Sequence, residues 1–285
     1  MHSNPKNILC TALLITASVA LFPTSAAAGP LTYATGDLLA GFRAGNGTDT
    51  KDFMIDLGSY TLFTTGASPA TPLAIGAIGA DLVAVFGANW KTRPDLFWSV
   101  VGTESVTKSN TLYITAPELT LHVAPGSPAP INSNSTQSPV AGKFDAAGAA
   151  YALNGDSATG SGGAATNSKG LRQLTTDNNS WSSFNGGSQA FSGNAWSYFS
   201  PATEANFGSG TATSALDLYQ IIRSGAPFAA PTAGAITNIG YFTINDSGVI
   251  SFGSPGPSPV PEPTSVFLLA SSLGVFGLKR RRGAR

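Results

Sequence analysis

Cysteine and histidine are nearly absent from this chain of 285 residues. The lone cysteine, Cys10, lies in an apolar N-terminal stretch, so the remainder has no disulfide, no thiolate metal ligand and no cysteine nucleophile. Beyond the N-terminus the one histidine is His122, which any Ser-His-Asp triad or histidine metal cluster would have to use. It stands within residues 119–123, beside no motif. Stability must therefore come from an apolar core, and we expect neither a cofactor nor a metal.

Charged side chains are scarce as well, at 11% of the chain. Residues 29–259 contain nine lysines and arginines against 14 aspartates and glutamates, which gives a net charge of −5. Nucleic-acid binding needs clustered cations, so the composition argues against it. Gly, Ser, Thr, Asn and Ala dominate while Lys and Glu are rare, a balance that favours strands and turns over surface helices.

The N-terminus has the three parts of a secretory signal peptide. Lys6 gives a weakly positive start, and residues 8–22 form an apolar run that a proline ends. Ala26 and Ala28 then satisfy the small-x-small rule and predict cleavage after Ala28. The lone cysteine lies at the start of the apolar run, which argues against a lipoprotein. We therefore expect a signal peptide over residues 1–28 and export through the Sec translocon.

The C-terminus carries a second tripartite pattern. Alternating prolines in residues 253–263 block helix and sheet and favour an extended, semi-rigid tether. Residues 264–278 follow without a charge and would span roughly 22 Å as a helix, which is short for a bilayer core of about 30 Å. A cationic cluster comes next, at Lys279, Arg280, Arg281 and Arg282. Because such cations snorkel and resist transfer, we expect a transmembrane helix and a cytoplasmic basic tail over residues 264–285. A buried core helix is the alternative.

This arrangement resembles the PEP-CTERM sorting signal of Gram-negative bacteria. The residues that carry the resemblance are the basic cluster, the small residues of the apolar stretch, and Val260, Pro261, Glu262 and Pro263. The resemblance implies recognition by an exosortase, a membrane transpeptidase-like enzyme that removes the signal near Pro-Glu-Pro. The chain would be anchored in the membrane transiently and then reach the cell surface or the extracellular matrix.

Alternating apolar residues predict a β-rich body over residues 29–252. Residues 31–43 and 52–58 predict a hairpin, with Phe53, Ile55 and Leu57 on one face. Further strands are predicted at 94–102, 111–115, 215–222, 239–244 and 249–252. A turn that needs Gly248 at positive φ joins the last two.

Helical spacing occurs in two places. Apolar residues recur at helical intervals over 78–87, where Gly87 is placed as a stop. Ser138-Pro139 can begin a second helix that reaches residue 152, with one stripe made by Val140, Phe144, Ala147 and Tyr151. The whole pattern predicts an antiparallel β-sandwich with one or two short helices. A split αβ arrangement is the alternative.

Carboxylates offer the remaining route to chemistry. Two of them could hydrolyse a glycoside, but Glu104, Glu118 and Glu204 stand in loop or strand-edge contexts, and nothing marks two as partners. Calcium is conceivable near a glycine-rich turn at Asp49, Asp52 and Asp56. Their spacing matches no calcium loop, so a solvated hairpin face is the preferred interpretation.

Aromatic residues gather in the second half of the body. They are Trp181, Trp196, Tyr198 and Phe199. Such residues could form a platform on which sugars stack, but in a β-rich body they more often belong to the core. We therefore prefer the core and keep the sugar platform as the alternative.

The body also resembles a group of exported PEP-CTERM proteins seen in Verrucomicrobia-like bacteria. The resemblance rests on residues 36–43, 78–82, 99–102 and 216–219 and on the terminal hairpin. It implies a role in exopolysaccharide or biofilm matrix and brings no catalytic residue. The resulting hypothesis is an exosortase-sorted surface or matrix protein that is structural or adhesive and not an enzyme. The alternative is a secreted hydrolase acting on polysaccharide.

Overall fold

The structure is a computed structural model that describes residues 31–45, 49–63, 70–104, 111–118, 134–154, 169–177, 180–186, 203–208, 215–222 and 236–254. Strands dominate these ranges and pair antiparallel, which confirms the predicted mainly β, antiparallel class. The strands are β1 (Asp37–Ala44), β2 (Lys51–Ser59), β3 (Thr71–Ala77), β4 (Leu96–Thr103), β5 (Thr111–Pro117), β6 (Gly170–Leu174), β7 (Ala205–Asn206), β8 (Leu216–Ile222), β9 (Ile236–Ile244) and β10 (Val249–Gly253). The helices in this part of the chain are α1 (Gly79–Phe86), α2 (Asn134–Asn154) and α3 (Trp181–Gly186), with the 3-10 turns η1 (Tyr60–Phe63) and η2 (Trp90–Thr92).

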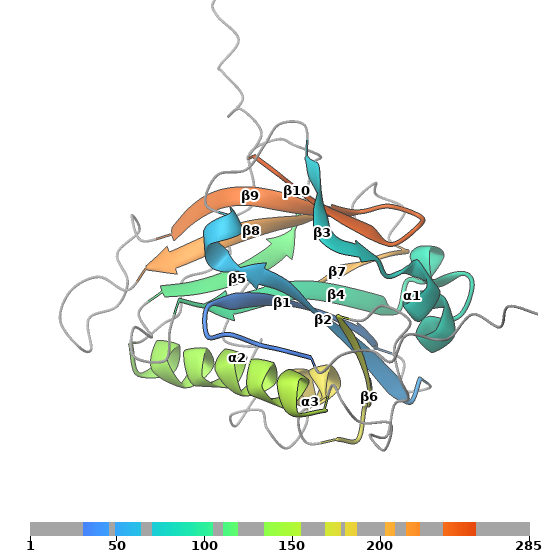
Figure 1. Ribbon diagram of the computed structural model, residues 1–285, viewed down its shortest axis with the longest axis horizontal. Coiled ribbons are helices and arrows are strands. Elements are labelled where there is room, and N and C mark those ends of the chain that lie inside the picture. Colours follow the sequence, from blue (N-terminus) through green and yellow to red (C-terminus); the bar gives the residue numbers. More distant parts are fainter. Residues whose placement is uncertain are drawn as a thin grey trace, which may run out of the picture.

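The strands join one curled sheet instead of the two separate sheets of a sandwich. The strand order is β3-β10-β9-β8-β5-β4-β1-β2-β6, and β7 pairs with β4. A continuous ladder from Thr111↔Ile222 to Pro117↔Leu216 ties β5 to β8, so the two halves of the sheet remain hydrogen-bonded to each other. Strand twist and a bulge between Leu38 and Leu39 help the sheet to curl. Figure 1 shows β8, β9 and β10 lying over β1, β2 and β4.

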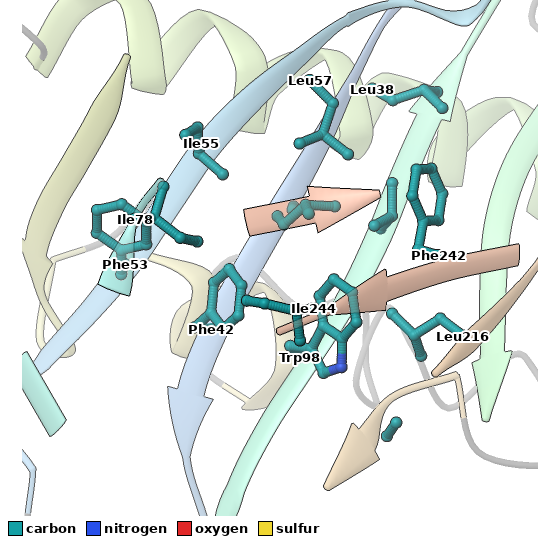
Figure 2. Packing of buried hydrophobic residues seen from close by; sticks show 14 of the residues in the cluster. Leu38, Phe42, Phe53, Ile55, Leu57, Ile78, Trp98, Leu216, Phe242 and Ile244 are labelled. Carbon is teal, nitrogen blue, oxygen red and sulfur yellow. The ribbon is translucent and has the colours of Figure 1, made fainter. Parts of the chain in front are cut away.

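The main core fills the space that the curled sheet encloses. Phe53, Ile55 and Leu57 all belong to it, which confirms the predicted apolar face of the hairpin. Figure 2 shows these side chains beside Leu216, Phe242 and Ile244 from the other half of the sheet. Aromatic rings reinforce the packing: those of Phe42 and Trp98 are nearly parallel at 5.5 Å between centroids. Since apolar burial contributes about 25 cal/mol per Å², this shared core holds the two halves together.

A second core lies on the outer face of the sheet, beneath α2. The predicted stripe of Val140, Phe144, Ala147 and Tyr151 is buried there, which confirms the helix. The helix is longer than expected, because it begins at Asn134 and not near Pro139. The buried stripe starts at Val140, so it did not mark the true beginning. Figure 1 shows α2 and α3 together below the sheet, and the outer face is therefore covered as well.

Several predicted segments lie outside the described residues. These are the signal peptide (1–28), nearly all of the tether, and the transmembrane helix with its basic tail (264–285). Within the described ranges, no helix combines the length and the apolar character needed to cross a membrane.

The predicted helix at 78–87 is present as α1, and a close glycine contact fixes it against the β9–β10 turn. Ile78 N donates to Gly248 O at 3.1 Å, and Gly79 N donates to Ser247 O at 3.2 Å. Gly248 has a φ of 76°, as the predicted turn requires. A Cβ at Gly248 would lie 2.2 Å from Gly79 N, and one at Gly79 would lie 2.5 Å from Ser247 O. Only glycine allows this approach.

Replacing Gly248 by alanine should therefore destabilise the body by about 2 kcal/mol or more, because both the positive φ and the backbone contact oppose a side chain. The matched control is Gly142→Ala in α2, where a Cβ meets nothing within 4 Å. That change should stabilise the helix by up to about 1 kcal/mol. Urea unfolding of the two variants measures both effects, and equal midpoints would contradict the proposed role of the glycine contact.

Candidate functional site

The three aspartates near the first hairpin lie in three different environments. Asp49 pairs with Arg93, whose Nη2 lies 2.5 Å from Asp49 Oδ2. Asp52 is fully buried and Asp56 is half-buried on the outer face of β2. The preferred interpretation of a solvated face is therefore wrong, because helices cover this face. In the part of the chain that the structure describes, no group of three His, Cys, Asp or Glu residues could hold a metal ion.

Asp52 caps α3 from within the sheet. Ser182 N donates to Asp52 Oδ2 at 2.6 Å, and Ser182 Oγ donates to Asp52 Oδ1 at 2.8 Å. Burial raises the pKa of Asp52 to about 6, although the Ser182 hydrogen bonds and the charge of Arg43 favour the ionised form. The carboxyl group therefore fastens a helix whose placement depends on its protonation.

Trp181, the first residue of α3, belongs to the core and not to a sugar platform. Its side chain is fully buried. A Cβ at Gly41 of β1 would lie 1.9 Å from Trp181 Cδ2, so the ring rests directly on the strand backbone. The other members of the predicted platform, Trp196, Tyr198 and Phe199, lie outside the described residues, as does His122.

The three glutamates are placed apart. Arg43 Nε lies 3.0 Å from both carboxylate oxygens of Glu204, so Glu204 belongs to an ion pair. Glu104 follows β4, where its N–H donates to Thr111 O at 3.2 Å. Glu118 follows β5 and is 1% exposed. No two of them form the catalytic pair that glycoside hydrolysis would need, in agreement with the absence of a sequence signal.

Glu118 instead lies near Asp217, a residue that sequence reasoning did not select. Asp217 on β8 is opposite Ala116 of β5 and Tyr241 of β9. Burial, followed by the negative charge of Glu118, raises the pKa of Asp217 to about 7, and Asn238 opposes the shift. One carboxyl that is protonated near neutral pH beside a second carboxyl is an arrangement capable of acid–base chemistry. The sequence signal was the apolar-Asp-apolar alternation at 216–218, which puts Asp217 opposite the core-facing leucines.

A second carboxyl pair joins the start of β1 to the end of β2. Asp37 and Asp56 share a side-chain hydrogen bond. Burial, together with the charge of Asp37 and this hydrogen bond, raises the pKa of Asp56 to about 7, against the effects of Gly58 N–H and Lys169. Two carboxyl groups can hydrogen-bond to each other only when one carries a proton. This acid pair, meaning Asp37 and Asp56, is thus a proton-holding site.

The C-terminal sorting signal matches a known family. Residues 259–282 match the PEP-CTERM protein-sorting motif. No curated protein and no solved structure gives a match. The matched range contains all the residues predicted from the resemblance: Val260, Pro261, Glu262, Pro263, Lys279, Arg280, Arg281 and Arg282.

The motif supports an exported protein that an exosortase processes and sorts to the cell surface. The signal-peptide residues Ala26 and Ala28 lie outside both the match and the described residues, so cleavage after Ala28 stays a prediction. The match does not reach the body, and the resemblance to Verrucomicrobia-like proteins gains no support from it.

The pKa of Asp52 predicts an unusual pH dependence of stability. Because its folded pKa is raised above the unfolded value, the folded state binds a proton more readily, and stability is lost as pH rises from about 4 through 6. The loss from this group is at most about 3 kcal/mol. Asp52→Asn should remove it, so the difference in unfolding free energy between pH 4 and pH 7 should change from that of the wild type.

Chemical denaturation of both proteins at several pH values measures this difference. Asp177→Asn, a change to a surface aspartate, is the control and should keep the wild-type profile. Parallel profiles for the wild type and Asp52→Asn would show that Asp52 has an ordinary pKa in the folded protein.

Proposed function

We propose that this protein is a structural or adhesive component of the bacterial surface or extracellular matrix, associated with exopolysaccharide in biofilm. The observation that carries the proposal is the sorting motif at residues 259–282, which assigns the chain an address outside the cell. The likeness of residues 36–43 and the terminal hairpin to matrix-associated exported proteins of the Verrucomicrobia-like type supports the finer assignment. A body that acts as a scaffold needs durability more than a reaction centre.

The packing of the described body fits that role. It holds two apolar cores, one on each face of the sheet, in a region of the sequence without cysteine. Its charged residues fasten elements together: Arg43 joins Glu204, Arg93 joins Asp49 and Asp95, and Arg172 Nη2 lies 2.6 Å from Asp81 Oδ1. Charged groups used in this way support a structural protein over an enzyme.

The alternative is a secreted hydrolase acting on polysaccharide, and one observation favours it. Asp217 and Glu118 form a buried carboxyl pair with one raised pKa. Their burial counts against the alternative, because Asp217 is 4% exposed and Glu118 is 1% exposed, which leaves little room for a sugar at the carboxyl groups.

The two functions can be separated with the purified full-length protein. A structural or adhesive protein should retain glycans on an array and leave chromogenic glycosides and esters unchanged. Turnover that is abolished by Asp217→Asn or Glu118→Gln, and retained in Glu104→Gln, would establish the hydrolase instead. In cells, deleting the gene should alter the texture of flocs or biofilm.

Neutralising Lys279, Arg280, Arg281 and Arg282 should impair sorting while leaving the body folded. The 15 uncharged residues before them are marginal as an anchor, and each cation costs about 2.5–3.5 kcal/mol to bring to the bilayer centre. Without the cations, little prevents the segment from slipping through the membrane. Cell fractionation follows the location of the variant, and thermal unfolding of the body should match the wild type.

The control keeps the four charges and exchanges arginine for lysine, and it should sort normally. If the neutral variant is retained and matures like the wild type, the tail is not a stop signal.

A further inference from the structure

The acid pair lies where three parts of the fold meet. Asp37 Oδ2 accepts a hydrogen bond from Ala34 N at 2.8 Å, and Asp56 Oδ1 accepts one from Gly58 N at 2.7 Å. Each carboxyl group therefore has one oxygen fixed by the backbone, while the two groups bond to each other. The nearby bulge between Leu38 and Leu39 shifts the register of β1 against β2 at this point. The geometry is specific to one proton between two acids.

The segment held by this pair is residues 31–36, which precede β1. Asp37 binds it through Ala34 N. On the other side, a Cβ at Gly148 of α2 would lie 2.1 Å from the ring of Tyr33, so the ring rests against the helix backbone. Thr35 Oγ1 donates to Asp145 Oδ1 of α2 at 3.2 Å. The segment is therefore fastened to the acid pair at one side and to α2 at the other.

The charges around the pair oppose a second negative charge there. Asp145 and the pair itself raise the pKa of Tyr33, and both acids of the pair raise the pKa of Tyr151 from α2, in each case after the larger effect of burial. Lys169, before β6, is the cation among the described residues that favours the ionised form of Asp56. Loss of the proton would leave two adjacent carboxylates with Asp145 nearby and would break the bond between them.

We propose that the Asp37–Asp56 pair is a proton-operated latch that closes residues 31–36 onto α2. With the proton in place, Asp37 is held and keeps Ala34 and the segment in position. When the proton leaves, the two carboxylates repel each other, Asp37 shifts, and the segment is released. Because the folded-state pKa of Asp56 is raised, the latch is fully closed below about pH 4 and opens as pH rises through about 7. This device is independent of the proposed matrix role.

Hydrogen exchange of the full-length protein, measured at pH 5.5 and pH 8.5 and corrected for intrinsic rates, tests the latch. Protection of the amides in residues 31–37 and at Tyr60, whose N–H donates to Gly36 O, should fall about tenfold at the higher pH. The pKa shift alone would allow a larger change, but Asp56 is half-buried and solvent screens part of it. Protection in β8 and β9 is the internal reference and should stay constant.

Asp56→Asn is the decisive variant. Its amide can donate to Asp37 without a titrating proton while its oxygen still accepts from Gly58 N, so the latch should stay closed at both pH values. Asp37→Asn offers the same replacement from the other side and serves if the first variant folds poorly. Asp246→Asn, at a side chain that is 94% exposed, is the control and should keep the wild-type response. Equal protection of the wild type at both pH values, or a pH response that persists in both latch variants, would overturn the proposal.

Discussion

The ladder between β5 and β8 is the pairing on which the rest of the structure depends. It joins the half of the sheet built from β6, β2, β1, β4 and β5 to the half built from β8, β9, β10 and β3. Without it, neither half could curl over the other, and the core that both halves line would be open to water. The two strands are separated by α2, β6, α3 and β7 along the chain, so the pairing closes a long loop before it is stabilised. We therefore expect folding to be limited by this step.

Burial on both faces of the sheet explains the unusual state of its acids. The inner face is apolar, and its apolar residues alternate along each strand with residues that point outward. In a two-layer fold those outward residues would meet water, but here Asp52 and Asp217 are covered as well. Each resolves the resulting desolvation differently. Asp52 receives two hydrogen bonds from a helix N-terminus, while Asp217 is driven toward the protonated form.

Local patterns made most of the strands predictable, because each alternation is written in a few neighbouring residues. Phe53, Ile55 and Leu57 announced β2, and the stripe ending at Tyr151 announced α2. The strand β3 was missed because Pro72 and Gly76 interrupt its apolar character, and β6 was missed inside a glycine- and serine-rich stretch. The curling of the sheet and the cover over Asp52 depend on partners distant in sequence, which no short window contains. For the same reason the sorting signal could be recognised from sequence, since it is contiguous, while the proximity of Glu118 to Asp217 could not.

The strand β3 stands at one end of the sheet, and its composition bears on how copies of this protein behave beside one another. It is seven residues long, uncharged and mostly exposed, so it resembles the kind of edge through which β-proteins join into fibres. Pro72 removes one backbone donor from that edge, and Gly76, with a φ of 81°, turns the chain away from a regular extended path. Its register against β10 is also irregular. These three features make the edge a poor template for a neighbouring chain, which protects molecules crowded on one surface from uncontrolled aggregation.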